Sequence, residues 1–288
     1  MYIRIPFGVN YAPSVNLGGP SKAPYSTGGQ YVGEKDTDKL LTVLRGLSPY
    51  QRFIEARFTS GAAARLPNHF LRIVSSPKDV PNEALRRRFV TVNNTIVGGT
   101  IDRAAGVIYM LELPKTPGYT RLELALHEAV HLFAHPFTSL IDERTFRNTY
   151  GRGCSPRDPT IGTFQRTFCR GFGEGATQAI TEQIMEAQGI TKYYADRPYE
   201  QFTPPAHEII RLFSTDLLGR AYFLGAIADF TRAMQWRWGN AWHNVANYTT
   251  AGEKQKALDE IKRLELEYLK RFGPKGDFPT PLLYKKYA

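Results

Sequence analysis

Residues 122 to 134 read Leu-Glu-Leu-Ala-Leu-His-Glu-Ala-Val-His-Leu-Phe-Ala, and the pattern His-Glu-x-x-His occupies positions 127 to 131. The run is rich in helix formers and contains no Gly or Pro, so it predicts a helix. At about 100° per residue, His127 and His131 lie roughly 40° apart on one face and one turn apart along the axis. Both imidazoles can then reach one metal ion, as in zinc sites with this spacing. Glu128 lies beside them and is the candidate general base.

The residues around this pattern are mostly apolar, which predicts that the helix is buried on most sides. The apolar surface comes from Leu124, Leu126, Val130, Leu132 and Phe133. Buried imidazole and carboxylate groups are costly without a partner. The surroundings therefore favour a metal site over a chance occurrence of the pattern.

Two histidines do not complete a catalytic zinc site, which normally has three protein ligands and an open position for water. The metzincin spacing would require a Gly at position 134 and a His at position 137. The sequence has Ala134 and Phe137 there, so this class is excluded. His135 lies about 80° around the helix from His127 and is better explained as a helix-end residue. The third ligand is therefore expected further along the chain.

Glu174 is the best candidate for the third ligand. It lies in Gly-Phe-Gly-Glu-Gly-Ala-Thr-Gln-Ala-Ile-Thr-Glu, residues 171 to 182, where a second helix is predicted to begin. A carboxylate in the first turn of that helix can complete a set of two His and one Glu. The helix dipole would also favour an acid there without any metal. Asp142 and Glu143 are the alternative ligands, by proximity and ligand type.

These motifs resemble the gluzincin-like branch of the zincin metallopeptidases, in which a second helix after H-E-x-x-H carries a Glu ligand. The resemblance implies a zinc ion (Zn2+) held by His127, His131 and Glu174. In that branch an acid often follows the ligand Glu by four residues and binds a ligand His. Here the position is Gln178, which can accept from an imidazole but cannot raise its basicity as a carboxylate would. Glu182, one turn further, is a candidate replacement.

A third motif, Arg-Ala-Tyr-Phe-Leu-Gly at residues 220 to 225, resembles a short segment of bacterial metallopeptidase domains of the toxin or injected-effector type. It makes Tyr222 the first candidate for a phenol that donates to the oxyanion during catalysis. Its helical spacing would equally suit a core aromatic residue. The alternative donors are Tyr193, Tyr194 and His207.

The chain of 288 residues is predicted to be α+β and zincin-like, and the resemblance covers roughly residues 95 to 230. Residues 1–35, rich in Gly, Pro, Ser and Asn, are expected to form a flexible lead segment. A small mixed β-sheet and the metal helix would form an N-terminal subdomain, residues 36–134. A mainly helical C-terminal subdomain would span residues 135–288, with the zinc in the cleft between the two.

Hydrophobic periodicity and turn residues predict the individual elements. Helices are expected over residues 39–58, interrupted at 46–49, and over residues 82–88, 174–187, 204–230 and 252–272. Strands are expected over residues 70–75 and 89–93, and as a hairpin over residues 95–101 and 106–112. The segment Val107 to Glu112 is expected to be the edge strand that binds an extended substrate.

The chain carries a net charge of +10 and has a pI near 9.5. This charge favours acidic partners such as nucleic acid, an anionic membrane or an acidic protein surface, for example an immunity protein, but no nucleic-acid motif accompanies it. No apolar run approaches the ~20 residues that a membrane span requires, so none is predicted. Cys154 and Cys169 are the two cysteines, and either a disulfide or a reduced pair is consistent with the sequence.

The sequence as a whole predicts a zinc metallopeptidase that hydrolyses peptide bonds in a protein or peptide substrate. The N-terminal residues lack the pattern of a secretory signal, so export by a specialised secretion or injection system is expected. Together with the lead segment and the motif at residues 220 to 225, this indicates a bacterial toxin or secreted effector. The alternatives are a non-catalytic zincin-like binding domain and a zinc hydrolase of a non-protein or cell-wall amide.

Overall fold

The computed structural model describes residues 34–60, 70–87, 89–92, 95–102, 106–111, 118–134, 171–190 and 199–273, which form a mixed α+β fold. The α+β prediction is confirmed at this level. The longer helices are α1 (Glu34–Arg45), α2 (Gln51–Ser60), α4 (Gly118–Phe133), α7 (Gly171–Ala187), α8 (Thr203–Phe213), α9 (Thr215–Leu224), α10 (Ile227–Trp238), α11 (Trp242–Thr250) and α12 (Lys254–Phe272). The short ones are α3 (Glu83–Arg86), η2 (Pro77–Asp79) and η3 (Gly239–Ala241).

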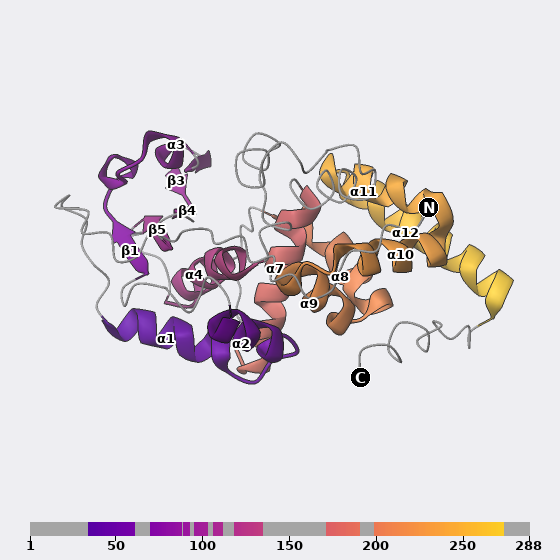
Figure 1. The fold of residues 1–288 in the computed structure, drawn as a ribbon. Helices are drawn as coiled ribbons and strands as arrows, with labels where there is room; N and C mark the ends of the chain where they lie inside the picture. The colour runs from indigo at the N-terminus through magenta and orange to yellow at the C-terminus, as the bar shows by residue number, and fades with distance from the viewer. Residues whose placement is uncertain are drawn as a thin grey trace, which may run out of the picture.

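The helices and the sheet are separated along the molecule (Figure 1). The strands and α3 lie at one end, and α8 to α12 gather at the other. Helices α4 and α7 lie between these two ends and pack against each other. Any group shared by α4 and α7 is therefore central in the fold.

The main sheet has the strand order β1 (Leu71–Val74), β5 (Val107–Leu111), β4 (Gly99–Asp102), with β1 parallel and β4 antiparallel to β5. The prediction that Val107 to Glu112 forms an edge strand is wrong, because β5 is hydrogen-bonded on both sides. All five of its residues are buried, as is typical of a central strand without polar alternation. Within the described part of the chain, β4 is an edge strand.

The predicted strand over residues 95–101 is broken into two at Gly98. Its φ of 128° lies where residues with a side chain rarely occur, so the chain changes direction there. Strand β3 (Thr95–Val97) then pairs antiparallel with β2 (Val90–Val92) in a separate two-stranded sheet. Only Gly99–Asp102 joins the hairpin with β5.

The two faces of the main sheet are both covered, and side chains of β5 alternate between them. Ile108 and Met110 join the main core on the side of α4. Val107, Tyr109 and Leu111 belong to a smaller cluster with Leu85 of α3. The sheet thus gives α4 a rigid apolar support.

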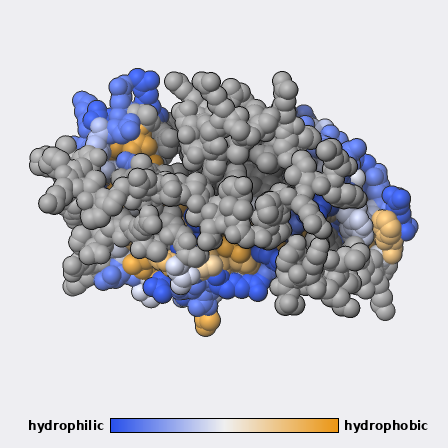
Figure 2. Space-filling model, in the orientation of Figure 1, coloured by the Kyte–Doolittle hydropathy of each residue, from blue (hydrophilic) through white to orange (hydrophobic). Residues whose placement is uncertain are grey.

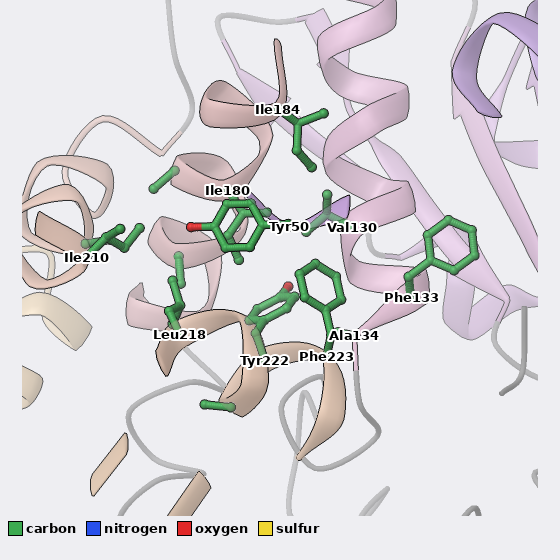
Figure 3. Close-up of a cluster of buried hydrophobic side chains, with 14 of the residues drawn as sticks. Tyr50, Val130, Phe133, Ala134, Ile180, Ile184, Ile210, Leu218, Tyr222 and Phe223 are labelled. Atoms are coloured by element: carbon green, nitrogen blue, oxygen red, sulfur yellow. The ribbon is translucent and has the colours of Figure 1, made fainter. Parts of the chain in front are cut away.

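The centre of the main core lies where α4, α7 and α9 meet (Figure 3). Val130 from α4, Ile180 from α7 and Phe223 from α9 lie around Tyr50, whereas Phe133 of α4 packs against Phe58 and Phe70. The Tyr50 hydroxyl donates to Gln183 Oε1 at 2.7 Å, so this buried phenol is satisfied. Close packing at this point fixes the position of α4 relative to α7.

The helices after α7 differ from the prediction mainly in where they end. Ser214 has a φ of 79° and Gly225 has a φ of 75°, so the predicted helix over residues 204–230 becomes α8, α9 and the start of α10. Ser214 also caps α9, because its hydroxyl accepts from Leu217 N at 3.3 Å. The predicted interruption between α1 and α2 is confirmed.

The outer helices expose a few large apolar side chains. Figure 2 shows hydrophobic residues near the end of α12, where Leu269 is 41% and Phe272 is 47% exposed. No helix in the described ranges combines the length and the apolar character needed to cross a bilayer. The predicted lead segment up to residue 33 and both cysteines lie outside the described residues.

Candidate metal centre

Helix α4 presents both histidines toward α7. Ala129 packs into the core on the opposite face of α4, so that His127 and His131 face the neighbouring helix. The side chain of His127 is 3% exposed and that of His131 is 16% exposed. The helical spacing that the sequence predicted is therefore present at a nearly dry helix interface.

Glu174, in the first turn of α7, meets both rings. Its Oε2 lies 3.3 Å from His127 Nε2 and 3.1 Å from His131 Nε2. One ligand atom from each of the three residues lies within 4.8 Å of the others. Two ligands at 2.0–2.1 Å from a tetrahedral zinc ion would lie about 3.3 Å apart, so the two distances from Glu174 Oε2 to the imidazoles fit such an ion.

The Glu174 side chain is one-third exposed, whereas the His127 side chain is nearly inaccessible. The ligand set therefore has a buried side and a side open to solvent. A catalytic zinc needs such an open side, where water and substrate can enter. A structural zinc would normally have all four positions closed by protein.

The three groups influence one another's protonation. Burial alone would raise the pKa of Glu174, but the two facing imidazoles outweigh it and hold this pKa well below its usual range. Burial alone would lower the pKa of His127, yet the Glu174 carboxylate outweighs it and raises this pKa. Glu174 thus favours the charged form of His127, and a metal ion bound at this nitrogen would displace that proton.

Both ring nitrogens that face away from Glu174 are held by the next turn of α7. His127 Nδ1 donates to Gln178 Oε1 at 2.9 Å. His131 Nδ1 lies 3.3 Å from Thr177 Oγ1, whose own hydrogen goes to Gly173 O at 2.8 Å. Positions 174, 177 and 178 share one helix face, so one segment supplies a ligand and orients the other two.

Tyr222 lies behind His131 rather than beside the ligand atoms. Its side chain is 1% exposed, and its hydroxyl contacts Thr177 Oγ1 and lies 3.5 Å from His131 Nδ1. Figure 3 shows its ring within the core, next to Phe223. The oxyanion role of Tyr222 stays a prediction, but this position also suits support of His131.

Tyr199 is an aromatic residue of the site that the sequence did not reveal. Its ring stacks on His127, with centroids 4.7 Å apart and planes within 2°. Burial, together with the nearby carboxylates of Glu174 and Glu128, raises the pKa of its hydroxyl. A phenol that stays protonated next to the ligand set is a candidate hydrogen-bond donor for substrate.

Glu128 is half-buried on α4 and faces β4. A Cβ atom added at Gly99 would lie 2.6 Å from Glu128 Cγ, so the absence of a side chain at Gly99 leaves room for Glu128. Glu128 is also close enough to His127 to raise its pKa by charge. The candidate base therefore lies between the ligand set and an edge of the sheet.

The other candidates of the sequence analysis lie elsewhere. His207 Nε2 donates to Glu182 Oε2 at 2.7 Å and does not join the ligand set. The alternative ligands and donors His135, Asp142, Glu143, Tyr193 and Tyr194 lie outside the described residues.

Two further residues, Glu123 and Thr177, support the ligands and were not predicted. Glu123 lies four residues before His127 on the same helix face, so its position was available from the periodicity.

Among known proteins, neither a family model nor a curated sequence nor a solved structure matches this chain.

Proposed function

We propose that this protein is a zinc-dependent metallopeptidase of zincin type. The observation that carries the proposal is the convergence of His127 Nε2, His131 Nε2 and Glu174 Oε2 on one point. Two imidazoles and a carboxylate, open on one side, are a typical ligand set of catalytic zinc. Glu128 directly follows one ligand on the same helix, as a general base for water would.

Bound zinc would supply Lewis-acid chemistry, because it makes water more acidic and polarises a carbonyl group. His127, His131 and Glu174 hold the ion. Glu128 accepts the proton of the attacking water and passes it to the leaving amine. Tyr199, protonated and next to Glu174, donates to the oxygen on which negative charge develops.

Strand β4 is the proposed binding site for the substrate backbone. It is an edge strand of the described sheet, packs against α4, and carries Gly99 next to Glu128. An extended peptide that adds to such an edge gains main-chain hydrogen bonds without needing a particular sequence. A peptide held there would run past the candidate base, which favours peptide bonds as the substrate.

The direct test combines metal analysis with a search for new protein termini. Purified protein should contain one zinc per chain. When it is added to a bacterial or eukaryotic lysate, new N-termini should appear that are absent with Glu128→Ala. Zinc binding without any new terminus would favour the non-catalytic binding domain, or a hydrolase of non-protein amides.

A role as a toxin or injected effector is part of the proposal and has its own test. Wild-type protein and Glu128→Ala are expressed at matched levels inside a susceptible cell. Growth arrest restricted to the wild type would support an effector that acts by cleavage. Equal growth of the two cultures would favour a benign peptidase.

Gly99→Ala is predicted to reduce peptide hydrolysis on the order of a hundredfold, because misplacing a catalytic group by about 1 Å has effects of this size. The new Cβ would push against Glu128 Cγ and displace the base. Zinc content should not change. Thr100→Ala in the same strand is the control, because the buried Thr100 hydroxyl has no hydrogen-bond partner among the described residues and lies one residue away. Full activity of Gly99→Ala would argue against Glu128 as base.

Tyr199→Phe is predicted to lower kcat by about tenfold to a thousandfold, the range for loss of one oxyanion donor. Tyr222→Phe should act mainly on zinc affinity, because its hydroxyl supports His131 through Thr177. Steady-state kinetics and zinc titration on both variants separate the two roles. If Tyr222→Phe loses turnover at full zinc occupancy and Tyr199→Phe does not, then Tyr222 is the donor.

A further inference from the structure

We propose that Gln178 is a positioning residue that fixes the ring tautomer of His127, and that the buried carboxylates of Glu123 and Glu182 fix Gln178 in turn. This inference rests on the proposed function only in taking His127 as a zinc ligand. It explains how an amide can stand where a carboxylate would be expected. It also assigns a purpose to two buried acids that the proposed reaction does not use.

The three side chains form a buried hydrogen-bonded group. Gln178 is 5% exposed, and Glu123 and Glu182 are each 4% exposed. Gln178 Nε2 donates to Glu123 Oε1 at 2.7 Å and to Glu182 Oε1 at 3.2 Å. Both hydrogens of the amide nitrogen are therefore used on carboxylate oxygens.

The two carboxylates leave the amide only one orientation. If the amide were reversed, its carbonyl oxygen would face two carboxylate oxygens and no donor. The carbonyl Oε1 must therefore face His127 Nδ1, 2.9 Å away. Because a carbonyl only accepts, the hydrogen lies on Nδ1, and the lone pair of Nε2 is directed to the side of Glu174.

The same geometry explains why the residue is Gln. A Glu at position 178 would bring three carboxylates together at a nearly dry position, which is strongly unfavourable. The amide instead bridges both acids, and these polarise it, which strengthens its acceptor oxygen toward His127. An amide with two acidic neighbours can thus approach the effect of a single carboxylate.

The group is anchored from a third helix. Glu182 Oε2 accepts from His207 Nε2 of α8 at 2.7 Å. His207 is 35% exposed and lines a cavity of about 320 Å³ together with Glu182. Hydrogen bonds therefore run continuously from the zinc-facing ring of His127 across α7 to α8, and α8 holds Glu182 in place.

The decisive experiment exchanges acid and amide. Gln178→Glu is expected to weaken zinc binding by about tenfold to a hundredfold, the usual range for residues that orient a ligand. The double variant Glu123→Gln with Gln178→Glu again has an acid and an amide in contact, so it should recover most of the lost affinity. Zinc affinity is measured by competition with a chelating dye.

Nitrogen NMR of the imidazole rings provides a measurement that does not depend on activity. In metal-free protein at alkaline pH, where imidazoles are neutral, His127 should carry its hydrogen on Nδ1. Gln178→Met should allow a mixture of tautomers while filling a similar volume. For Gln178→Glu, the matched control is Gln183→Glu on the same helix, because a carboxylate there can still accept from Tyr50.

Each outcome decides for or against the proposal. Gln178→Glu binding zinc as tightly as wild type, or a double variant that stays weak, would overturn it. An unfolded Gln178→Glu whose fold and zinc binding return in the double variant would support it, because only the exchange relieves the contact of three carboxylates. A tautomer unchanged in Gln178→Met would overturn it as well. If the exchange behaves as expected but the wild type cleaves nothing, the proposed peptidase function fails while the positioning role stands.

Discussion

Glu128→Gln is expected to retain zinc and the fold but to hydrolyse peptide bonds about a thousandfold more slowly, within the range known for loss of a general base. Gln has nearly the shape of Glu, so the space beside Gly99 stays filled. It cannot accept a proton from water, so the attacking nucleophile is no longer generated. The loss should fall on kcat, because substrate binding along β4 does not involve the proton transfer.

The measurement is kcat and KM on a peptide identified from the new termini, with zinc content determined on the same samples. Glu186→Gln, an exposed site on α7, is the control for the same chemical change. Unchanged turnover in Glu128→Gln at full zinc occupancy would contradict the mechanism. Loss of zinc together with activity would instead assign Glu128 a role in holding the ion.

Removing a ligand is expected to have the second large effect. His131→Ala and Glu174→Ala should each abolish stoichiometric zinc binding, since only two of the three ligands remain. Free zinc at a hundred times Kd should stabilise the wild type by about 2.7 kcal/mol and leave both variants without a measurable gain. Thermal unfolding with and without zinc, together with metal analysis, gives this comparison.

Glu174→Ala should also change the stability of the metal-free protein. In Glu174→Ala the two imidazoles lose the carboxylate that raises the pKa of His127, so part of the stability of the metal-free protein is lost as well. That part is present where Glu174 is ionised and His127 is protonated, and it disappears as pH rises through the raised pKa of His127 or falls through the lowered pKa of Glu174. Full zinc binding by Glu174→Ala, together with loss of zinc binding in Asp142→Ala, would show that the third ligand is Asp142 and not Glu174.

The cluster of His127, His131 and Glu174 could be predicted from sequence because each half of it is local. The spacing of His127 and His131 on one helix, and an acid at the start of another, require only helical periodicity and ligand chemistry. The contact between α4 and α7 was inferred by resemblance. The distances between Glu174 and the two histidines could not be predicted, because they depend on how the core around Tyr50 packs.

The sheet and the supporting residues show where sequence reasoning stopped. A central strand is covered on both faces and paired on both sides, so it is typically apolar throughout. The apolar run of β5 fits this pattern, so the sequence itself favours a central strand over the predicted edge strand. Tyr199 stacks on His127 although it lies far from α4 in the sequence, where no periodicity relates the two. Such contacts arise only when distant elements meet, so no local pattern records them.

The arrangement of ligands on α4 and α7 has a consequence for how the chain tolerates change. His131 and Glu174 are separated by 43 positions, yet the hydrogen bonds from Gln178 and Thr177 that orient the rings come from α7 itself. Closing a loop costs free energy only with the logarithm of its length, about 0.6 kcal/mol for each doubling. A bound zinc ion would act as a cross-link between α4 and α7. A change in the length of the sequence between them would therefore alter the free energy of bringing the two helices together only slightly.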